Sequence, residues 1–394
     1  MRIDRESIVM WMIGLILIGS GGCKRLYTPP AIKAPNNYLV VEGVINTGSD
    51  SSLIRLTRTV PLSSLNGSTP ETGATINIIS DANLSYPVFE KGNGYYISKP
   101  VNGNGQTKYA LKITTKNGES YQSDFVSPIN SPAIDSVYYK VKSDGVDIYL
   151  DTHDPTNSAK YYRWDYTDTY LFHTAFHSIG KFAKAPKDTV VFRPLAEQNF
   201  QCWHSDTSSS ILLGSTAKLS QTVISQAPIV SIPSTSIKIS NRYSINVNQY
   251  GLTTDAYNYY YLLQQNTQNI GTIFDPQPSQ VPGNIHSLSN PAEVVIGYIT
   301  AGKPTKYRIF IDTHNLPAWL SDNPYSGCLL DTDYYHPGRG QNSIADYIYT
   351  GIDIPVNPVA PPLSAIIGWS GSSPYCVDCT LNGTNIKPDY WTDF

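Results

Sequence analysis

Three short patterns in the chain have the spacing of catalytic serine sites. Ser215-Thr216-Ala217-Lys218 fits S-x-x-K and Ser321-Asp322-Asn323 fits S-D-N, as in penicillin-binding enzymes. That chemistry needs a K-[TS]-G element, which the sequence lacks, and a serine–lysine pair on a buried helix. Gly368-Trp369-Ser370-Gly371-Ser372 departs from the G-x-S-x-G elbow at its last position. None of these patterns gives a catalytic residue, so we expect a protein that is not an enzyme.

Two histidines have a spacing that suits metal binding. His173 and His177 are four residues apart, so a strand or a helix would place both on one face. No third ligand is evident, and no glutamate adjoins either histidine as in HExxH. We therefore interpret them as polar residues at the edge of a loop, and we expect no metal and no other cofactor.

The five cysteines offer covalent chemistry. Cys23 follows small residues near the N-terminus, and the other four are Cys202, Cys328, Cys376 and Cys379. In an oxidising compartment an even set predicts two disulfides, with three possible connectivities. The C-x-x-C spacing of the last two also allows a redox pair, but no βαβ pattern surrounds it. We favour structural bridges, with at least one of this pair joined to Cys328 or Cys202.

The N-terminal residues predict an exported, lipid-anchored protein. Basic residues precede an apolar run over residues 8–18, which is shorter than the ~20 residues needed to span a bilayer. Gly19-Ser20-Gly21-Gly22-Cys23 follows and resembles a bacterial lipobox. We expect residues 1–22 to be a signal peptide, Cys23 to be acylated, and residues 23–37 to form a proline-rich tether. The alternative is ordinary signal cleavage with an incidental thiol at Cys23.

Composition agrees with this compartment. The 394 residues include 28 Lys+Arg and 31 Asp+Glu, for a net charge of −3, which excludes a nucleic-acid binder held by charge. The 29 tyrosines suit half-buried strands and the 28 prolines interrupt helices. We therefore expect a mainly β, loop-rich chain.

The first folded unit is predicted over residues 38–126. Period-two alternation and β-branched runs indicate strands at 39–45, 52–59 and 74–79. Asn117-Gly118 between two further runs is a strong hairpin signal. This spacing predicts a small β-sandwich, and it resembles transthyretin-like or carboxypeptidase-regulatory modules.

The remaining residues, 133–394, form a predicted tyrosine-rich β domain. Its first part, about 133–250, indicates a fibronectin-type sandwich interrupted by a polar insert at 174–210. A helix is expected over 256–269, with Tyr257, Tyr260 and Tyr261 on one face. A strand is expected over 291–299, followed by long Pro- and Gly-rich loops. Aromatic residues near the C-terminus, including Trp391, are expected to dock onto this domain, pinned by the disulfides.

Two tripeptides resemble the O-glycosylation sequon of Bacteroidota. Asp135-Ser136-Val137 lies in a predicted strand, and Asp188-Thr189-Val190 lies in the polar insert. Ser136 and Thr189 are therefore candidate acceptors, and the insert position suits Thr189 better.

Several segments together resemble a Bacteroidota lipoprotein family, domain of unknown function 4249. They are Leu39-Val40-Val41-Glu42-Gly43, Phe274-Asp275-Pro276-Gln277-Pro278, Cys376-Val377-Asp378-Cys379-Thr380 and Lys387-Pro388-Asp389-Tyr390-Trp391. The resemblance implies residence in the outer membrane and a TonB-dependent receptor of the nutrient-importing kind as partner. In these bacteria an acidic stretch after the lipidated cysteine often directs export to the cell surface. This chain has the basic pair Lys24-Arg25 there instead, so the sequence does not decide which leaflet of the outer membrane holds the protein.

Three functional hypotheses follow from these patterns. The first is a lipoprotein that binds or gates a ligand for a TonB-dependent transporter. The second is a cell-surface glycan-binding or adhesion lipoprotein that acts without a transporter. The third, a secreted hydrolase, is disfavoured by the incomplete catalytic motifs.

Overall fold

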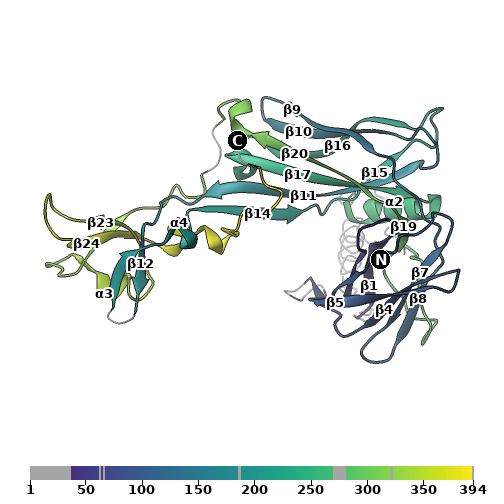
Figure 1. The fold of residues 1–394 in the computed structure, drawn as a ribbon, viewed down its shortest axis with the longest axis horizontal. Helices are drawn as coiled ribbons and strands as arrows, with labels where there is room; N and C mark the ends of the chain where they lie inside the picture. The colour runs from purple at the N-terminus through teal and green to yellow at the C-terminus, as the bar shows by residue number, and fades with distance from the viewer. Residues whose placement is uncertain are drawn as a thin grey trace, which may run out of the picture.

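The structure of the chain is a computed structural model that describes residues 37–61, 64, 67–184, 188–268, 281–319 and 323–392. The predicted signal peptide and Cys23 lie outside these residues. The fold is mainly β, as expected, with 45% strand and 10% helix. No helix in the described residues is long and apolar enough to cross a membrane. The molecule is elongated: two β units form a body, and long strands lead from it to a smaller distal module (Figure 1).

The first unit is one curled ten-stranded sheet in the order β18-β8-β7-β4-β5-β6-β2-β1-β19, with β3 paired to β2. Its strands are β1 (Leu39–Asn46), β2 (Leu53–Thr59), β3 (Ser68–Pro70), β4 (Thr75–Ser80), β5 (Ser85–Gly92), β6 (Tyr95–Ser98), β7 (Tyr109–Thr114), β8 (Ser120–Ser123), β18 (Ile285–Ser287) and β19 (Thr300–Gly302).

Alternating apolar residues build the core of this unit. Ile76 and Ile78 on β4 are buried while their neighbours face outward, and Ile54 and Leu56 repeat the pattern on β2. Each fully buried side chain of this size contributes about 1.5–3 kcal/mol. The predicted Asn117-Gly118 turn is confirmed between β7 and β8, where Gly118 takes a φ of 85°.

The boundary of the first unit differs from the sequence-based one. β18 pairs with β8, and β19 runs parallel to β1, although both come from the range assigned to the second domain. The strand expected over 291–299 is wrong: the segment is irregular and meets β1 only through an isolated bridge at Ile296. Gly297 explains this, because its φ is 138° and a Cβ there would lie 2.1 Å from the Val41 carbonyl oxygen.

The second unit is a sandwich of two sheets whose strands lie along the upper part of the body (Figure 1). One sheet has the order β16-β10-β9, and the other has the order β14-β11-β17-β20 with β15 added to β11. The strands are β9 (Ile134–Val141), β10 (Gly145–His153), β11 (Tyr161–His173), β14 (Gln201–Thr207), β15 (Leu212–Ser215), β16 (Val223–Pro233), β17 (Arg242–Leu252) and β20 (Thr305–Asp312).

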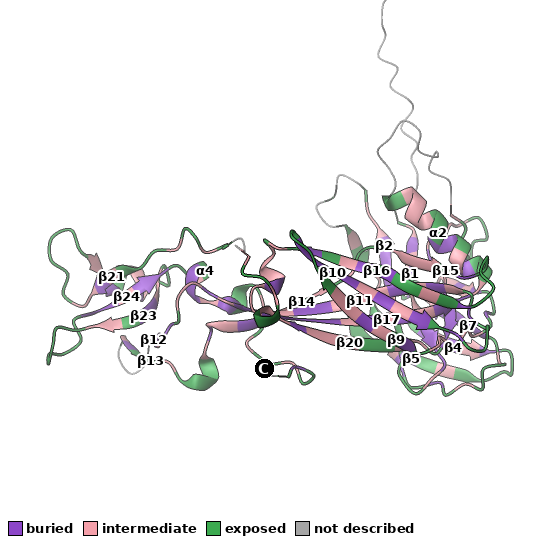
Figure 2. Ribbon diagram, turned by 90° about the horizontal axis from the view of Figure 1, so that it is seen from above, coloured by how far each residue is buried: buried purple, intermediate pink, exposed green. Residues whose placement is uncertain are grey.

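The core of this sandwich lies between its sheets. Ile148 and Leu150 on β10 pack in one cluster with Trp164 on β11 and Ile245 on β17. The buried positions run along the strands of the body, whereas the loops at the distal end are largely exposed (Figure 2). The predicted insert at 174–210 is not only loop, because β14 falls within it and pairs with β11.

The predicted helix is α2 (Thr254–Gln268), which packs against the end of the sandwich. The expected tyrosine face is partly wrong. Ala256, Tyr259 and Tyr260 are buried, whereas Tyr261 is 45% exposed. The buried face of the helix keeps the expected i, i+3, i+4 spacing, but it begins at Ala256 and not at Tyr257. The small alanine side chain allows the helix to pack closest to the sheet at that position.

The distal module consists of short elements where the sequence predicts only irregular loops. They are the hairpin β12 (Gly180–Ala183) and β13 (Thr189–Phe192), the sheet β22 (Asn342–Ser343), β21 (Asp331–Tyr334), β24 (Gly368–Ser372) and β23 (Ile354–Val359), and the helices α3 (Ile344–Tyr347) and α4 (Pro374–Val377). The 3-10 helices of the described residues are η1 (Leu195–Glu197), η2 (Ile237–Ile239), η3 (Thr313–Asn315) and η4 (Cys379–Leu381). Trp369 is the largest buried side chain of the module. It packs closely on Gly180, because a Cβ added to Gly180 would lie 2.6 Å from the Trp369 ring.

Two disulfides fix the C-terminal part of the chain. Cys328 is joined to Cys376 inside the distal module, and Cys202 on β14 is joined to Cys379. Both members of the C-x-x-C pair therefore bridge to distant partners, in agreement with the expectation for at least one. A disulfide of this kind typically stabilises a fold by about 2–4 kcal/mol.

The C-terminal residues dock as predicted. Trp391 is 5% exposed and meets Trp203 and Phe310 edge to face, with ring centroids 6.2 and 5.6 Å away. The Tyr390 hydroxyl lies 2.8 Å from the Thr169 hydroxyl on β11. An aromatic plug and a disulfide thus hold the end of the chain on the second unit.

Candidate functional site

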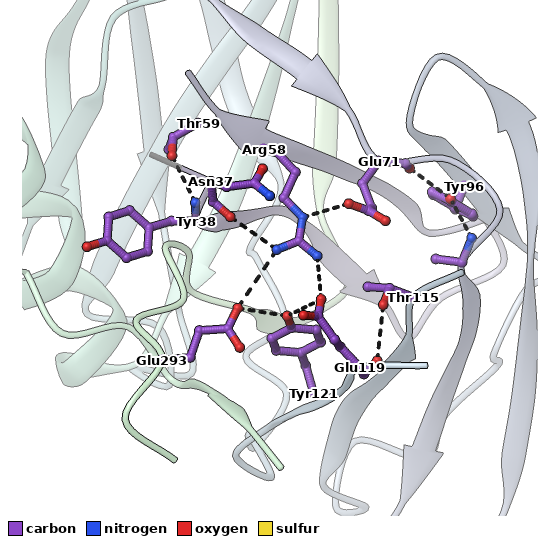
Figure 3. Close-up of polar contacts among 11 residues, drawn as sticks. Asn37, Tyr38, Arg58, Thr59, Glu71, Tyr96, Thr115, Glu119, Tyr121 and Glu293 are labelled. Atoms are coloured by element: carbon purple, nitrogen blue, oxygen red, sulfur yellow. Dashed lines mark hydrogen bonds and ion pairs between the residues drawn. The ribbon is translucent and has the colours of Figure 1, made fainter. Parts of the chain in front are cut away.

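The densest group of charges in the first unit surrounds Arg58 on β2 (Figure 3). Its Nε donates to Glu71 at 2.6 Å, one Nη donates to Glu119 at 3.0 Å, and the other donates to the Asn37 carbonyl at 3.2 Å. Glu293, from the irregular segment that crosses β1, lies 3.8 Å from the same guanidinium. The cluster therefore ties β2 to four other stretches of chain.

This cluster is a structural tie, because its donors are used internally. The Tyr121 hydroxyl lies 2.8 Å from Glu293 and 3.1 Å from Glu119, which closes a ring of polar contacts. Burial lowers the pKa of Arg58, but the hydrogen bond and charge of Glu71 outweigh it, so the net shift is upward. A guanidinium with each nitrogen already bonded has little left to offer a ligand.

A second arginine, Arg163 on β11, lies in a cleft of about 450 Å³ between the two β units. One wall is the outer face of β1 and β2, and the other is the outer face of β11, β14, β17 and β20. The size is that of a small-molecule site. The lining residues are Glu42, Gly43, Val44, Asn46, Ser51, Leu53, Arg55, Arg163, Asp165, Thr207, Asn248, Tyr250, Pro304 and Lys306.

Strand alternation on β11 directs Arg163 and Asp165 into this cleft. Tyr162 and Trp164 point the other way, into the sandwich core, so the residues on either side of Trp164 face outward. The cross-strand partner of Arg163 on β17 is Tyr250, and that of Asp165 is Asn248. The cleft is therefore fixed by sheet register rather than by loops.

Aromatic rings hold the Arg163 guanidinium. Its carbon lies 4.5 Å from the ring centroid of Tyr250 and 4.8 Å from that of Tyr260, which α2 supplies. Such cation–π contacts contribute about 0.5–2 kcal/mol each and orient the planar group. Burial opposes its charge, but the nearby oxygens of Tyr260 and Asp165 raise the pKa of Arg163 overall.

The hydrogen bonds of Asp165 come mainly from neutral donors. Asn248 donates its side-chain N–H to the Asp165 carboxylate at 2.7 Å, and the Tyr250 hydroxyl donates at 3.3 Å. Burial and then the charge of Asp165 raise the pKa of Tyr250, which keeps this hydroxyl protonated. Arg163 reaches the carboxylate only at 3.5 Å.

Arg163 is consequently short of acceptors. Its Nε is buried and has no hydrogen-bond partner, and its side chain is only 21% exposed. An unpaired buried donor costs about 1–3 kcal/mol, and more when the group is charged. This is the main chemical difference from Arg58, which is also buried but bonded at every nitrogen.

Two further cations line the opening of the cleft. Arg55 on β2 lies 3.5 Å from Glu42, and Lys306 on β20 lies 2.9 Å from Asp50. Both pairs are about half exposed, so water screens them and they rearrange easily. The lining thus holds three cations and two carboxylates.

Two other hollows in the surface of the described residues have no charged side chains in their linings. One, of about 530 Å³, lies between the end of β11 and the segment around Trp319, and the other, of about 520 Å³, lies between β15 and β16. Neither lining includes Asp, Glu, Lys or Arg. Of these three hollows, the cleft that contains Arg163 is the one lined by charged residues.

The histidine and serine patterns lie outside the cleft that contains Arg163. The rings of His173 and His177 both contact Phe200, with centroids 4.8 and 5.0 Å from that of its ring. Across the ranges that the structure describes, no group of three His, Cys, Asp or Glu side chains is placed to hold a metal ion. The Ser215 hydroxyl oxygen accepts a hydrogen bond from the Ala217 backbone, and residues 321–322 lie outside the described ranges.

The two candidate glycosylation residues lie far apart. Ser136 is on β9, where its hydroxyl donates to Asp151 at 3.4 Å on the outer face of the sheet. Thr189 begins β13 in the distal module. Both side chains are partly exposed.

Comparison with protein-family models gives one match. Residues 24–308 match the family described as Domain of unknown function (DUF4249). The chain belongs to this family. The match covers the first unit, most of the second and every residue that lines the cleft, whereas the C-terminal segments at 376–380 and 387–391, on which the resemblance also rested, lie beyond the matched range.

Other comparisons add little about this DUF4249 protein. No curated protein matches it. An adhesin, InvE of Yersinia pseudotuberculosis, is 14% identical over 54% of this chain and 55% of its own, with a TM-score of 0.16. A structure titled as manganese lipoxygenase of Gaeumannomyces graminis with partial zonadhesin of Komagataella pastoris is 7% identical over 57% of this chain and 91% of its own, also at 0.16. The chain thus spans about half the length of the adhesin, and scores this low carry no argument.

Sequence reasoning missed Arg163 and its cleft. The alternation Tyr161 to Asp165 contained a usable signal, because it places two opposite charges on one face of a strand whose other face is aromatic. The alternation on this strand could not indicate the second wall of the cleft. That wall comes from β1 and β2, more than one hundred residues earlier in the chain.

Proposed function

We propose that this DUF4249 protein is a non-enzymatic lipoprotein of the outer membrane, acylated at Cys23, which binds a ligand on behalf of a TonB-dependent nutrient transporter. The observation that carries the proposal is the cleft between the two β units, where a buried guanidinium is oriented by aromatic rings but lacks acceptors. A preformed charged cleft of this volume suits a binding protein. The two disulfides suit an oxidising compartment.

The finer fold assignments also belong to this proposal. We infer that the first unit is related to transthyretin-like or carboxypeptidase-regulatory sandwiches and the second to fibronectin-type domains. The two facing sheets of the second unit support the fibronectin-type relation, and the support for the first relation is the single core that the curled ten-stranded sheet encloses, although that unit has one sheet and not the two expected of a sandwich.

The distal module supplies a surface for a protein partner. Leu363 is fully exposed in the loop between β23 and β24, and Ile366 and Ile367 next to it are about 40% exposed. Leu363 also has a φ of 60°, a conformation that is uncommon for residues other than glycine. An exposed apolar loop with backbone strain is typical of an interaction site.

Affinity purification tests the partnership. A tagged chain is extracted in mild detergent from native cells, and the bound proteins are identified by mass spectrometry. We expect enrichment of a TonB-dependent receptor with the wild type and a reduced yield with Leu363→Ser, whereas Leu195→Ser, an exposed leucine outside this loop, serves as the matched control. Recovery of the wild type without any such receptor would contradict the proposed partnership.

A glycan-binding role is the second candidate, and one observation favours it. On the outer face of β9 and β10, the rings of Tyr138 and Tyr149 stack with centroids 6.0 Å apart, and Lys140 lies 4.9 Å from the Tyr149 ring. Partly exposed tyrosine rings beside Asp147 and Asp151 suit sugar stacking and hydroxyl recognition. Binding to a glycan array that Tyr149→Ala abolishes, without any receptor in the purification, would favour this function over the first.

A further inference from the structure

We propose that the cleft between the two β units binds a small carboxylate, a monoanion with an apolar body, whose two oxygens take the free edge of the Arg163 guanidinium. This inference rests on the proposed binding function and names its ligand class. The argument begins with the unused donors. Arg163 carries five N–H groups, yet the contact at 3.5 Å to Asp165 is its one ion pair among the described residues, and the 21% of its side chain that stays exposed is the part that a ligand can reach.

The geometry of the guanidinium selects an acceptor. Tyr250 and Tyr260 contact the planar group through their rings, at 4.5 and 4.8 Å, so hydrogen bonding is left to its edge. A carboxylate matches such an edge with two parallel hydrogen bonds, which a neutral amide or hydroxyl cannot do as strongly. The rings also limit the conformational entropy that Arg163 loses when a ligand binds.

The neighbouring carboxylates limit the charge of the ligand. Asp165 is bonded by Asn248 and Tyr250, and Glu42 contacts Arg55 at the opening. Both remain acidic groups of the lining, so a phosphate dianion would meet their repulsion with little compensation. Lys306 and Arg55 have their own carboxylate partners, Asp50 and Glu42, so a ligand with a single negative charge matches the one guanidinium that it would contact.

The remaining lining describes the rest of the ligand. Leu53 is 53% exposed at the cleft, and Val44 and Pro304 extend this apolar surface beside the Tyr250 ring. A flat or branched apolar group would cover them and remove them from water. The volume of about 450 Å³ suits a small organic acid and excludes a folded protein segment.

Side-chain NMR of the full chain tests the assignment. The Nε–H signals of ¹⁵N-arginine-labelled protein are followed while acetate, benzoate, succinate, benzamide and inorganic phosphate are added in turn, and the Arg163 signal is assigned by its loss in Arg163→Gln. We expect benzoate to shift that signal saturably and benzamide, its neutral isostere, to leave it unmoved. No saturable shift with any of the three carboxylates, or tighter binding of benzamide or phosphate than of benzoate, would overturn the proposal.

Calorimetric titration of benzoate gives the matched mutant comparison. Loss of charge-assisted hydrogen bonds predicts that Arg163→Gln weakens binding about tenfold or more. Arg163→Lys keeps the positive charge and serves as the second variant in case Arg163→Gln does not fold. We expect Arg163→Lys to bind benzoate more weakly than the wild type, because an ammonium group cannot make the two parallel hydrogen bonds. Arg339→Gln, an exposed arginine of the distal module, is the control. Unchanged affinity in both Arg163 variants would refute the assignment.

The two proposals fail separately. If a receptor co-purifies but carboxylates do not bind at Arg163, the transporter function stands and the ligand class falls. If benzoate binds at Arg163 and no receptor co-purifies, the ligand class stands and the transporter function falls.

Discussion

Replacing Arg58 by methionine should destabilise the first unit strongly. Arg58 is 8% exposed, and its removal leaves Glu71 and Glu293, whose side chains are 13% and 19% exposed, without their cation. Breaking a buried ion pair by removing one partner costs about 3–5 kcal/mol, because the remaining charge stays buried. Glu119 is 43% exposed and keeps its hydration, so it adds little.

Scanning calorimetry at neutral pH measures this effect. At about 2–4 °C per kcal/mol for a domain of 150–250 residues, we expect Arg58→Met to lower Tm by roughly 6–20 °C. Arg55→Met is the matched control, because it removes an arginine from the same strand whose pair with Glu42 is exposed, and it should cost about 1 kcal/mol or less.

A compensating variant separates the buried-charge argument from simple loss of packing. Glu71→Gln and Glu293→Gln introduced together with Arg58→Met remove the orphaned charges, so the triple variant should recover part of the lost Tm. If Arg58→Met melted within about a degree of Arg55→Met, the view of this cluster as a structural tie would be wrong.

Three further predictions concern other parts of the chain. Cys23→Ala should abolish labelling of the protein by a fatty-acid analogue in cells, and equal labelling of both forms would exclude acylation at this residue. Deleting residues 387–394 removes the Trp391 plug and should lower Tm by several degrees in calorimetry, whereas an unchanged melt would mean that the plug contributes no stability. Burial and then the charge of Asp353 raise the pKa of Asp333 to about 6, so its contribution to stability is complete below its unfolded pKa of about 4 and is lost as pH rises through 6. Asp333→Asn should therefore stabilise the protein at pH 8 by an amount on the order of 3 kcal/mol, but not at pH 4, and urea titrations at both pH values would expose an error if the two gains were equal.

Local signals predicted the strands and turns well. The alternation on β2 and β4 and the Asn117-Gly118 turn are properties of neighbouring residues, so one sequence suffices to find them. The docking of Trp391 could also be predicted, because a large ring next to paired cysteines has a clear reason to be buried. The helix was located correctly, and its buried face differed because the sheet beneath it favoured Ala256.

Long-range pairing could not be predicted in this way. Nothing local in Thr300 to Gly302 indicates a parallel strand beside β1, and nothing near Arg163 indicates that the first unit covers it. The distal module escaped prediction for a related reason, since its strands are two to six residues long and depend on the disulfide between Cys328 and Cys376.

The return of the chain to the first unit has a consequence for how the protein can be divided. β18 covers one edge of the ten-stranded sheet and β19 covers the other, so a fragment of residues 38–126 would leave β8 and β1 with unpaired backbone N–H and C=O groups along both margins. Such open margins recruit strands from other molecules and lead to aggregation. The same fragment would lack Glu293 and the segment that crosses β1. A piece that keeps the first unit whole therefore extends at least through Gly302, and it carries most of the second unit with it.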